Sequence, residues 1–293
     1  AYSHQDLYFE TDLDHVGFVM PTPLLNKDTY MGISITRLGL PDQQGRGTNR
    51  EKTGRFDTSD LAIGAALASN FGSFQLGSQF KFLRQELAEF NAQGVAVDLG
   101  VLTRTPLSCL SIGGAVRNLG PKMKFISEEF YLPLTLSIGA AYQLMSPLTI
   151  GMDVQSQPHQ DKLSLSFGTE FLAVQNIVLR AGYLSKMAES ITNNQISESN
   201  RGNIATEGLT AGLGLRYKNF HLDYAFSQFG ELGLTHSFTI STSFGSERID
   251  SLSSSSPVSL PPPEKSPTPS PPSEPDRIIV IFAAPYGEDQ WWN

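Results

Sequence analysis

The chain has 293 residues, a formal net charge of -8 and a pI near 5.1. This acidic balance argues against nucleic acid as a partner, and the single cysteine, Cys109, excludes an intrachain disulfide and a Cys-based metal site. Charged residues make up only 17% of the chain, against about a quarter in ordinary globular domains. No apolar run approaches the roughly eighteen residues of a transmembrane helix, and the length fits one large barrel or two soluble domains.

Segments that alternate apolar residues with small or polar ones predict β-strands, because successive side chains of a strand point to opposite faces. In chain order these segments are 2–11, 14–20, 29–38, 58–69, 73–87, 93–104, 108–117, 132–143, 147–155, 162–171, 176–184, 207–217, 220–228 and 234–244. The alternation is poorest in the first two segments. It is clearest between 134 and 171, where Leu163, Leu165 and Phe167 alternate with serine and glycine.

These segments fit a membrane better than a soluble sheet. Many run to about ten residues, the length that a tilted strand needs to cross a bilayer, whereas soluble strands are usually about half as long. Their second face is built from Gly, Ser and Thr rather than the Lys and Glu of a solvated surface. The sequence therefore predicts an all-β fold: a transmembrane antiparallel up-and-down β-barrel of about fourteen strands, with its apolar face toward outer-membrane lipid.

The predicted connections alternate between long and short. The long ones are 39–57, 88–92, 118–131, 156–161, 185–206 and 229–233, and the short ones are 70–72, 105–107, 144–146, 172–175 and 218–219. Outer-membrane barrels place short turns in the periplasm and long loops outside the cell, so both ends of the barrel are expected at the periplasmic side. The first hairpin, around Asp12–Asp14, is an exception because it is short where this scheme expects a long loop.

Aromatic residues at the predicted strand ends suggest two interfacial girdles, because aromatic rings favour the boundary between lipid and water. Those expected at the periplasmic boundary are Tyr142, Phe171, Tyr217, Phe220 and Phe244, and those expected at the extracellular boundary are Phe130, Tyr131, Tyr183, Phe226 and Phe229.

The composition changes after Phe244. We expect the barrel to occupy 1–246, a disordered Ser/Pro-rich linker to occupy 247–276, and a short strand-like segment to occupy 277–293. This periplasmic extension is interpreted as a linker into a further domain; the alternative is a tethered peptide that docks on a periplasmic partner by strand addition. Because a barrel requires export, we also expect a signal peptide upstream of Ala1.

Charged and titratable residues on the predicted inner face are the candidate site residues: Asp98, Asp153, Glu170, Arg180, Arg216, His221 and Asp223. Arg216 and Asp223 flank one tight turn, and Glu170 and Arg180 flank another, so we expect ion pairs between neighbouring strands. The alternative is a transverse field that acts on a solute. Inward glycines leave room for a plug segment or for a passage; they are Gly64, Gly77, Gly139, Gly151, Gly168, Gly182, Gly212 and Gly214.

The sequence predicts no enzyme, no catalytic or metal-binding residues and no cofactor. Ser78 and Lys81 match an S-x-x-K motif, but residues three apart on a strand point to opposite faces. The five histidines lack metal-site spacing. Gly212 and Gly214 lie inside a strand and lack the third glycine of a dinucleotide-binding loop.

Several segments resemble the PorV/PorQ family of FadL-like outer-membrane proteins. They are Ala115–Phe125, Leu132–Tyr142, Leu179–Tyr183, Leu209–Tyr217, Leu222–Phe226 and Gly230–His236. The resemblance spans most of 1–244 and implies a fourteen-stranded barrel. It also departs from the family: the Gly-rich N-terminal segment with an Asn-Pro-Ala motif, which would form a plug, is absent, and the Pro-rich tail is an addition.

The resemblance implies a PorV-type component of type IX protein secretion, located in the outer membrane of a Gram-negative-type cell. Its partners would be outer-membrane lipid and secretion-system or periplasmic proteins. The alternative is FadL-like transport of a small hydrophobic ligand. A further alternative is a structural barrel that anchors a periplasmic element, in which case deletion of 251–293 would abolish function while the barrel still inserts.

Overall fold

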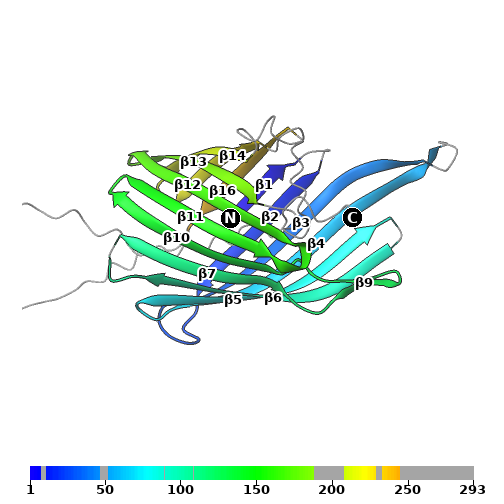
Figure 1. Ribbon diagram of the computed structural model, residues 1–293, viewed down its shortest axis with the longest axis horizontal. Coiled ribbons are helices and arrows are strands. Elements are labelled where there is room, and N and C mark those ends of the chain that lie inside the picture. Colours follow the sequence, from blue (N-terminus) through cyan, green and yellow to red (C-terminus); the bar gives the residue numbers. More distant parts are fainter. Residues whose placement is uncertain are drawn as a thin grey trace, which may run out of the picture.

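The computed structural model describes residues 1–7, 11–46, 52–88, 90–107, 109–187, 208–228 and 233–244. They form one closed antiparallel barrel, in which successive wall strands pair with one another and β1 closes the ring on β16 (Figure 1). The predicted fourteen-stranded up-and-down barrel is therefore confirmed. The predicted linker at 247–276 and the segment 277–293 lie outside the described residues.

The wall strands are β1 (Tyr2–Asp6), β2 (Asp12–Pro21), β3 (Thr29–Arg46), β4 (Lys52–Asn70), β5 (Phe74–Leu87), β6 (Phe90–Arg104), β7 (Leu110–Leu119), β10 (Thr135–Met145), β11 (Leu148–Gln157), β12 (Lys162–Val174), β13 (Ile177–Met187), β14 (Leu209–Tyr217), β15 (Phe220–Gln228) and β16 (Leu234–Thr242). The connection between β7 and β10 contains the short strands β8 (Met123–Phe125) and β9 (Glu128–Phe130), and the 3-10 helix η2 (Pro158–Gln160) follows β11. No helix among the described residues is long and apolar enough to cross a membrane.

The outer face of the barrel is apolar. On β12, Leu163, Phe167 and Phe171 are 41%, 49% and 42% exposed, while Ser166 and Gly168 on the other face line the interior. In water such exposure of large apolar side chains would be costly, whereas lipid satisfies it. The apolar periodicity of these strands therefore reflects contact with the bilayer and not a packed core.

The barrel has two unlike ends. Connections such as β3–β4, β7–β10 and β11–β12 lie at one end, called the long-loop end here, and tight turns such as 146–147 and 218–219 lie at the other, the short-turn end. In Figure 1 the β3–β4 hairpin projects beyond the rest of the wall, at the same end of the barrel as β9.

Three predicted connections are wrong. The connection predicted at 88–92 is shorter, because β6 already begins at Phe90. The first hairpin does not turn at Asp12–Asp14, because Asp12 pairs with Asp6 and Asp14 with His4 inside the β1–β2 ladder. The predicted loop 39–57 is largely strand, since β3 continues to Arg46 and β4 begins at Lys52. Where a hairpin extends past the bilayer, lipid no longer imposes an apolar face, so the alternation that marks a strand disappears.

The β7–β10 connection, predicted as a long loop at 118–131, folds into the barrel. Met123 and Leu132 are 1% and 5% exposed and pack with Ala62, Leu83 and Ala96 on the inner face of the wall. The chain comes so close to β6 that a Cβ at Gly120 would overlap the carbonyl oxygen of Val95. This connection therefore fills one side of the interior with a small apolar core.

Candidate functional site

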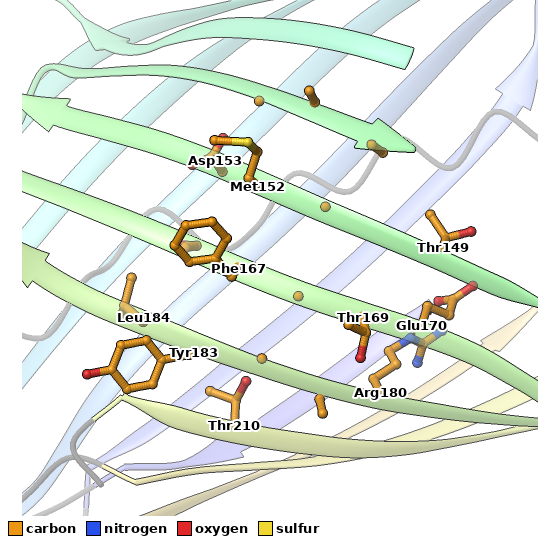
Figure 2. Close-up of a pocket in the computed structure, with 18 of the residues that line it drawn as sticks. Thr149, Met152, Asp153, Phe167, Thr169, Glu170, Arg180, Tyr183, Leu184 and Thr210 are labelled. Atoms are coloured by element: carbon orange, nitrogen blue, oxygen red, sulfur yellow. Dashed lines mark hydrogen bonds and ion pairs between the residues drawn. The ribbon is translucent and has the colours of Figure 1, made fainter. Parts of the chain in front are cut away.

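A cavity of about 910 Å³ occupies the other side of the barrel interior, against the inner faces of strands β6 to β15. This volume lies in the range of pockets that hold small molecules. Figure 2 shows part of its wall, with Thr149, Glu170, Arg180 and Thr210 on neighbouring strands. The cavity is the space in which a solute inside the barrel would lie, so we take it as the candidate site.

Three glycines form a patch of bare backbone in this wall. Gly151 on β11 pairs with Gly168 on β12, which in turn pairs with Gly182 on β13. A Cβ at Gly151 or Gly168 would come no closer than 3.7 Å or 3.8 Å to its nearest neighbour, so side chains would fit at both positions. The missing side chains therefore add free volume to the cavity and leave the strand backbone open to contact with a ligand.

An ion cluster lies next to this patch, nearer the short-turn end. Arg180 Nε donates to Glu170 Oε2 at 2.8 Å, and Arg180 Nη1 donates to Asp223 Oδ1 at 2.5 Å. Glu170 and Arg180 are register partners on β12 and β13. Their side chains remain 44% and 39% exposed, so the cluster faces the cavity and is not buried within the wall.

Gly214 explains how Arg180 reaches a residue two strands away. Asp223 on β15 pairs with Gly214 on β14, and Arg180 on β13 pairs with Gly212 of the same strand. A Cβ at Gly214 would lie 2.7 Å from Asp223 Oδ1 and 3.3 Å from Arg180 Nη1. The guanidinium therefore crosses β14 over backbone that carries no side chain.

The other candidate residues of these strands also lie on inner faces. Asp153 lines the cavity opposite Gly139, where a Cβ would come within 2.9 Å of its carboxylate. Arg216 faces His221 across the last pair but one before the turn at 218–219. The expected partner of Asp223 was Arg216, which lies diagonal to it; among the described ion pairs Asp223 is instead bonded to Arg180.

Asp98 lies on the filled side of the interior. Its Oδ1 is 2.7 Å from Lys81 Nζ, with both side chains at most 6% exposed. The same oxygen accepts a hydrogen bond from the backbone N of Asn118 at 2.8 Å, and Lys81 also donates to Asn118 Oδ1 at 2.5 Å. Because Asn118 is the last residue but one of β7, this network ties the end of β7, from which the inward-folded connection leaves, to β5 and β6. Lys81 is not among the predicted site residues, although it shares the face of Gly77 and Gln79 on β5.

The aromatic residues of the expected girdles occupy several environments. Tyr142, Phe171, Tyr217, Phe220 and Phe244 are all exposed, from 39% to 82%. Tyr183 and Phe226 share the outer faces of their strands with Leu179 and Leu222. Tyr131 stacks on His159 with ring centroids 4.5 Å apart, whereas Phe130 packs against the interior apolar core. Phe229 lies outside the described residues.

The outer faces of β1 and β2 carry a polar group that interrupts the apolar wall. His4 lies 2.9 Å from Asp14 and 3.1 Å from Asp6, on the face that β16 continues with Phe238 and Ile240. His4, Asp6 and Asp12 offer metal-ligand atoms within 4.8 Å of one another. This cluster was not predicted, because the first turn was expected at Asp12–Asp14. The β1–β2 ladder places Asp6 opposite Asp12 instead.

The expected absence of catalytic geometry at Ser78 and Lys81 follows from the register. Ser78 pairs with Leu67 and Leu99 on the outer face, and Lys81 points inward to Asp98. The two side chains therefore lie on opposite sides of the wall.

No protein-family model matches the chain, and no curated protein matches it. Solved structures do. The toluene transporter TbuX of Ralstonia pickettii matches with a TM-score of 0.57 at 12% identity, covering 83% of this chain and 88% of the other. The monoaromatic hydrocarbon channel CymD matches with a TM-score of 0.55 at 11% identity over 83% and 87%. The Pseudomonas putida toluene transporter TodX matches at 0.53 and 10% identity over 82% and 85%.

At this identity the likeness concerns the fold. The chain shares the closed barrel fold of these transport proteins. The neighbours are channels and transporters rather than enzymes. The narrower assignment to PorV/PorQ stays a prediction.

Proposed function

We propose that this chain is an outer-membrane channel that admits small hydrophobic molecules. The observation that carries the proposal is the cavity of about 910 Å³ with its bare glycine patch, inside a closed barrel. The solved barrels that share the fold include two toluene transporters and a monoaromatic hydrocarbon channel. A ligand of that kind needs apolar contact and few hydrogen bonds, which a wall of Gly, Ala and Thr supplies.

Because one side of the interior is filled, a solute would pass along the other side only. The inward-folded connection packs Met123 and Leu132 against the wall of β4 to β6, so a solute is confined to the cavity along β10 to β15. There the glycine patch lies between Asp153 and the Arg180 cluster.

Uptake of labelled toluene by whole cells tests the proposal. Gly168→Phe places a ring in the cavity, where a side chain fits without a clash at Cβ. Ala181→Phe adds the same ring to the outer face of the adjacent strand and serves as the matched control. We expect Gly168→Phe to abolish uptake and Ala181→Phe to leave it unchanged. Equal uptake by both variants at the wild-type rate would contradict a route through this cavity.

A second candidate is a PorV-type role in type IX secretion, favoured by the resemblance across Ala115–Phe125 and the segments that follow it. In that case the barrel handles exported proteins, and its partners are secretion-system or periplasmic proteins. Co-purification on the tagged full chain separates the two candidates. Retained secreted proteins together with normal toluene uptake in a deletion strain would favour secretion over the channel.

A further inference from the structure

The cavity wall is negatively charged. Among the described residues that line it, the carboxylates are Asp153, Glu170 and Asp223, and Arg180 is the one cation. The guanidinium is already engaged by two of these carboxylates. Glu170 and Asp223 keep side-chain exposures of 44% and 35%, so oxygens that accept hydrogen bonds dominate the polar surface offered to a solute.

Three other inner-face cations lie outside the cavity lining. Lys81 is buried against Asp98 on the filled side of the interior. Arg117 donates to Gln155 Oε1 at 3.0 Å, and Arg216 faces His221 beyond the cavity lining, toward the short-turn end. None of these three side chains belongs to the described lining, although the charge of Arg117 acts on Asp153. The unbalanced negative charge therefore lies at Glu170 and Asp223, which share the single guanidinium of Arg180.

The charged cluster stands in a fixed relation to the glycine patch. Glu170 follows Gly168 by two positions on β12, and Arg180 precedes Gly182 by two on β13. Residues two apart on a strand lie about 7 Å apart on the same face. An apolar ring held against the glycine patch would therefore place a short polar substituent beside Glu170, Arg180 and Asp223.

The geometry points to a cavity that selects hydrophobic solutes by the charge of their polar end, taking amines and alcohols and rejecting carboxylates of the same size. An ammonium or hydroxyl group donates to the exposed carboxylate oxygens, whereas an anionic end meets an excess of negative charge that Arg180, already neutralised, does not relieve. This inference rests on the proposed function, because it specifies the solute that the same cavity takes.

Equilibrium dialysis of the full-length protein in lipid nanodiscs measures this preference. The probes are 2-phenylethylamine, 2-phenylethanol, phenylacetate and ethylbenzene, and empty nanodiscs give the background from partition into lipid. Replacing a positive end group of the probe by a negative one beside this cluster should weaken binding by about tenfold or more. We therefore expect the amine to bind at least about tenfold more tightly than phenylacetate, with the ratio falling as salt is added.

The double variant Glu170→Gln/Asp223→Asn removes two carboxylates from the cavity and leaves Arg180. We expect it to lose the preference for the amine and to bind phenylacetate more tightly than the wild type does. The matched control Glu86→Gln/Glu128→Gln removes the same charge outside the cavity lining and should keep the wild-type ratio. The salt dependence of the wild-type ratio tests the inference without any variant.

The outcomes separate this inference from the proposed function. Ethylbenzene binding together with phenylacetate binding as tight as that of the amine would overturn charge selection and leave the hydrophobic channel standing. A ratio that is insensitive to salt, or equally lost in both double variants, would also overturn charge selection. No binding of any probe above the empty-nanodisc background would overturn the channel itself.

Discussion

The two sides of the barrel interior differ in how they hold their charged side chains. Along β4 to β6 the wall is covered by the inward-folded β7–β10 connection and sealed by the Lys81–Asp98 pair, in which both side chains are at most 6% exposed. Along β10 to β15 the wall is bare glycine backbone beside a cluster that keeps about two fifths of its surface exposed. Charge serves as a structural anchor on the filled side and as a ligand-facing surface on the open side.

The largest effect should come from breaking the buried pair. Asp98→Ala leaves Lys81 as an unpaired buried charge and removes the acceptor for the Asn118 backbone, which should cost about 3 kcal/mol or more of unfolding free energy. Asp223→Ala on the open side should cost about 1 kcal/mol or less, because its partner is substantially solvated. Urea unfolding in micelles measures both. Comparable losses would mean that the two sides do not differ in kind.

A second prediction tests the orientation of the open wall. Leu165→Arg directs a charge outward into lipid and should cost about 2–4 kcal/mol near the midplane. Ser166→Arg directs the same side chain into the cavity, where water and carboxylates receive it, and should be tolerated far better. The pair differs by one position on β12, so both variants share composition and strand. Equal penalties in the unfolding assay would reverse the assigned faces.

The third prediction tests the packing of the filled side by removing a side chain from its apolar core. Met123→Ala removes a side chain that is 1% exposed from the interior core and should cost about 2 kcal/mol. It should also loosen the β7–β10 connection, so protease added from the long-loop side should cleave within 120–134 more readily. Ile126→Ala, at a position 61% exposed in the turn between β8 and β9, is the control and should change neither measurement. Unchanged cleavage in Met123→Ala would show that the Met123 side chain does not hold the connection in place.

The sequence predicted the barrel because lipid favours apolar side chains at the outward positions of the wall strands, and this alternation is visible without coordinates. The prediction failed where the outward face of a strand is not apolar. The β3–β4 hairpin projects beyond the rest of the wall, and its sequence was predicted as a loop. The outward polar residues of β1 and β2 led to a wrong position for the first turn. Strands of three residues, such as β8 and β9, are too short to show a period.

The candidate site was predictable only in part, for a geometric reason. Alternation placed Glu170 and Arg180 on one face across a tight turn, and the two are hydrogen-bonded. The same logic expected Asp223 to pair with Arg216 on the neighbouring strand. Alternation could not predict that Arg180 crosses β14. That contact depends on the absence of side chains at the glycines of β14.

The smallest expected effect concerns the contact of Arg180 with Asp223 across β14. Gly214→Ala adds one methyl group 2.7 Å from Asp223 Oδ1 and 3.3 Å from Arg180 Nη1, so it should separate Arg180 from Asp223 while the Arg180–Glu170 contact persists. Because the cluster is partly solvated, the unfolding free energy should fall by about 1 kcal/mol or less. Gly168→Ala, with its nearest neighbour at 3.8 Å, controls for the backbone effect of replacing glycine in a strand. A crystal structure of Gly214→Ala that retains the Arg180–Asp223 bond would show that the guanidinium path does not depend on the missing side chain, and that the open side is less finely fitted than the filled one.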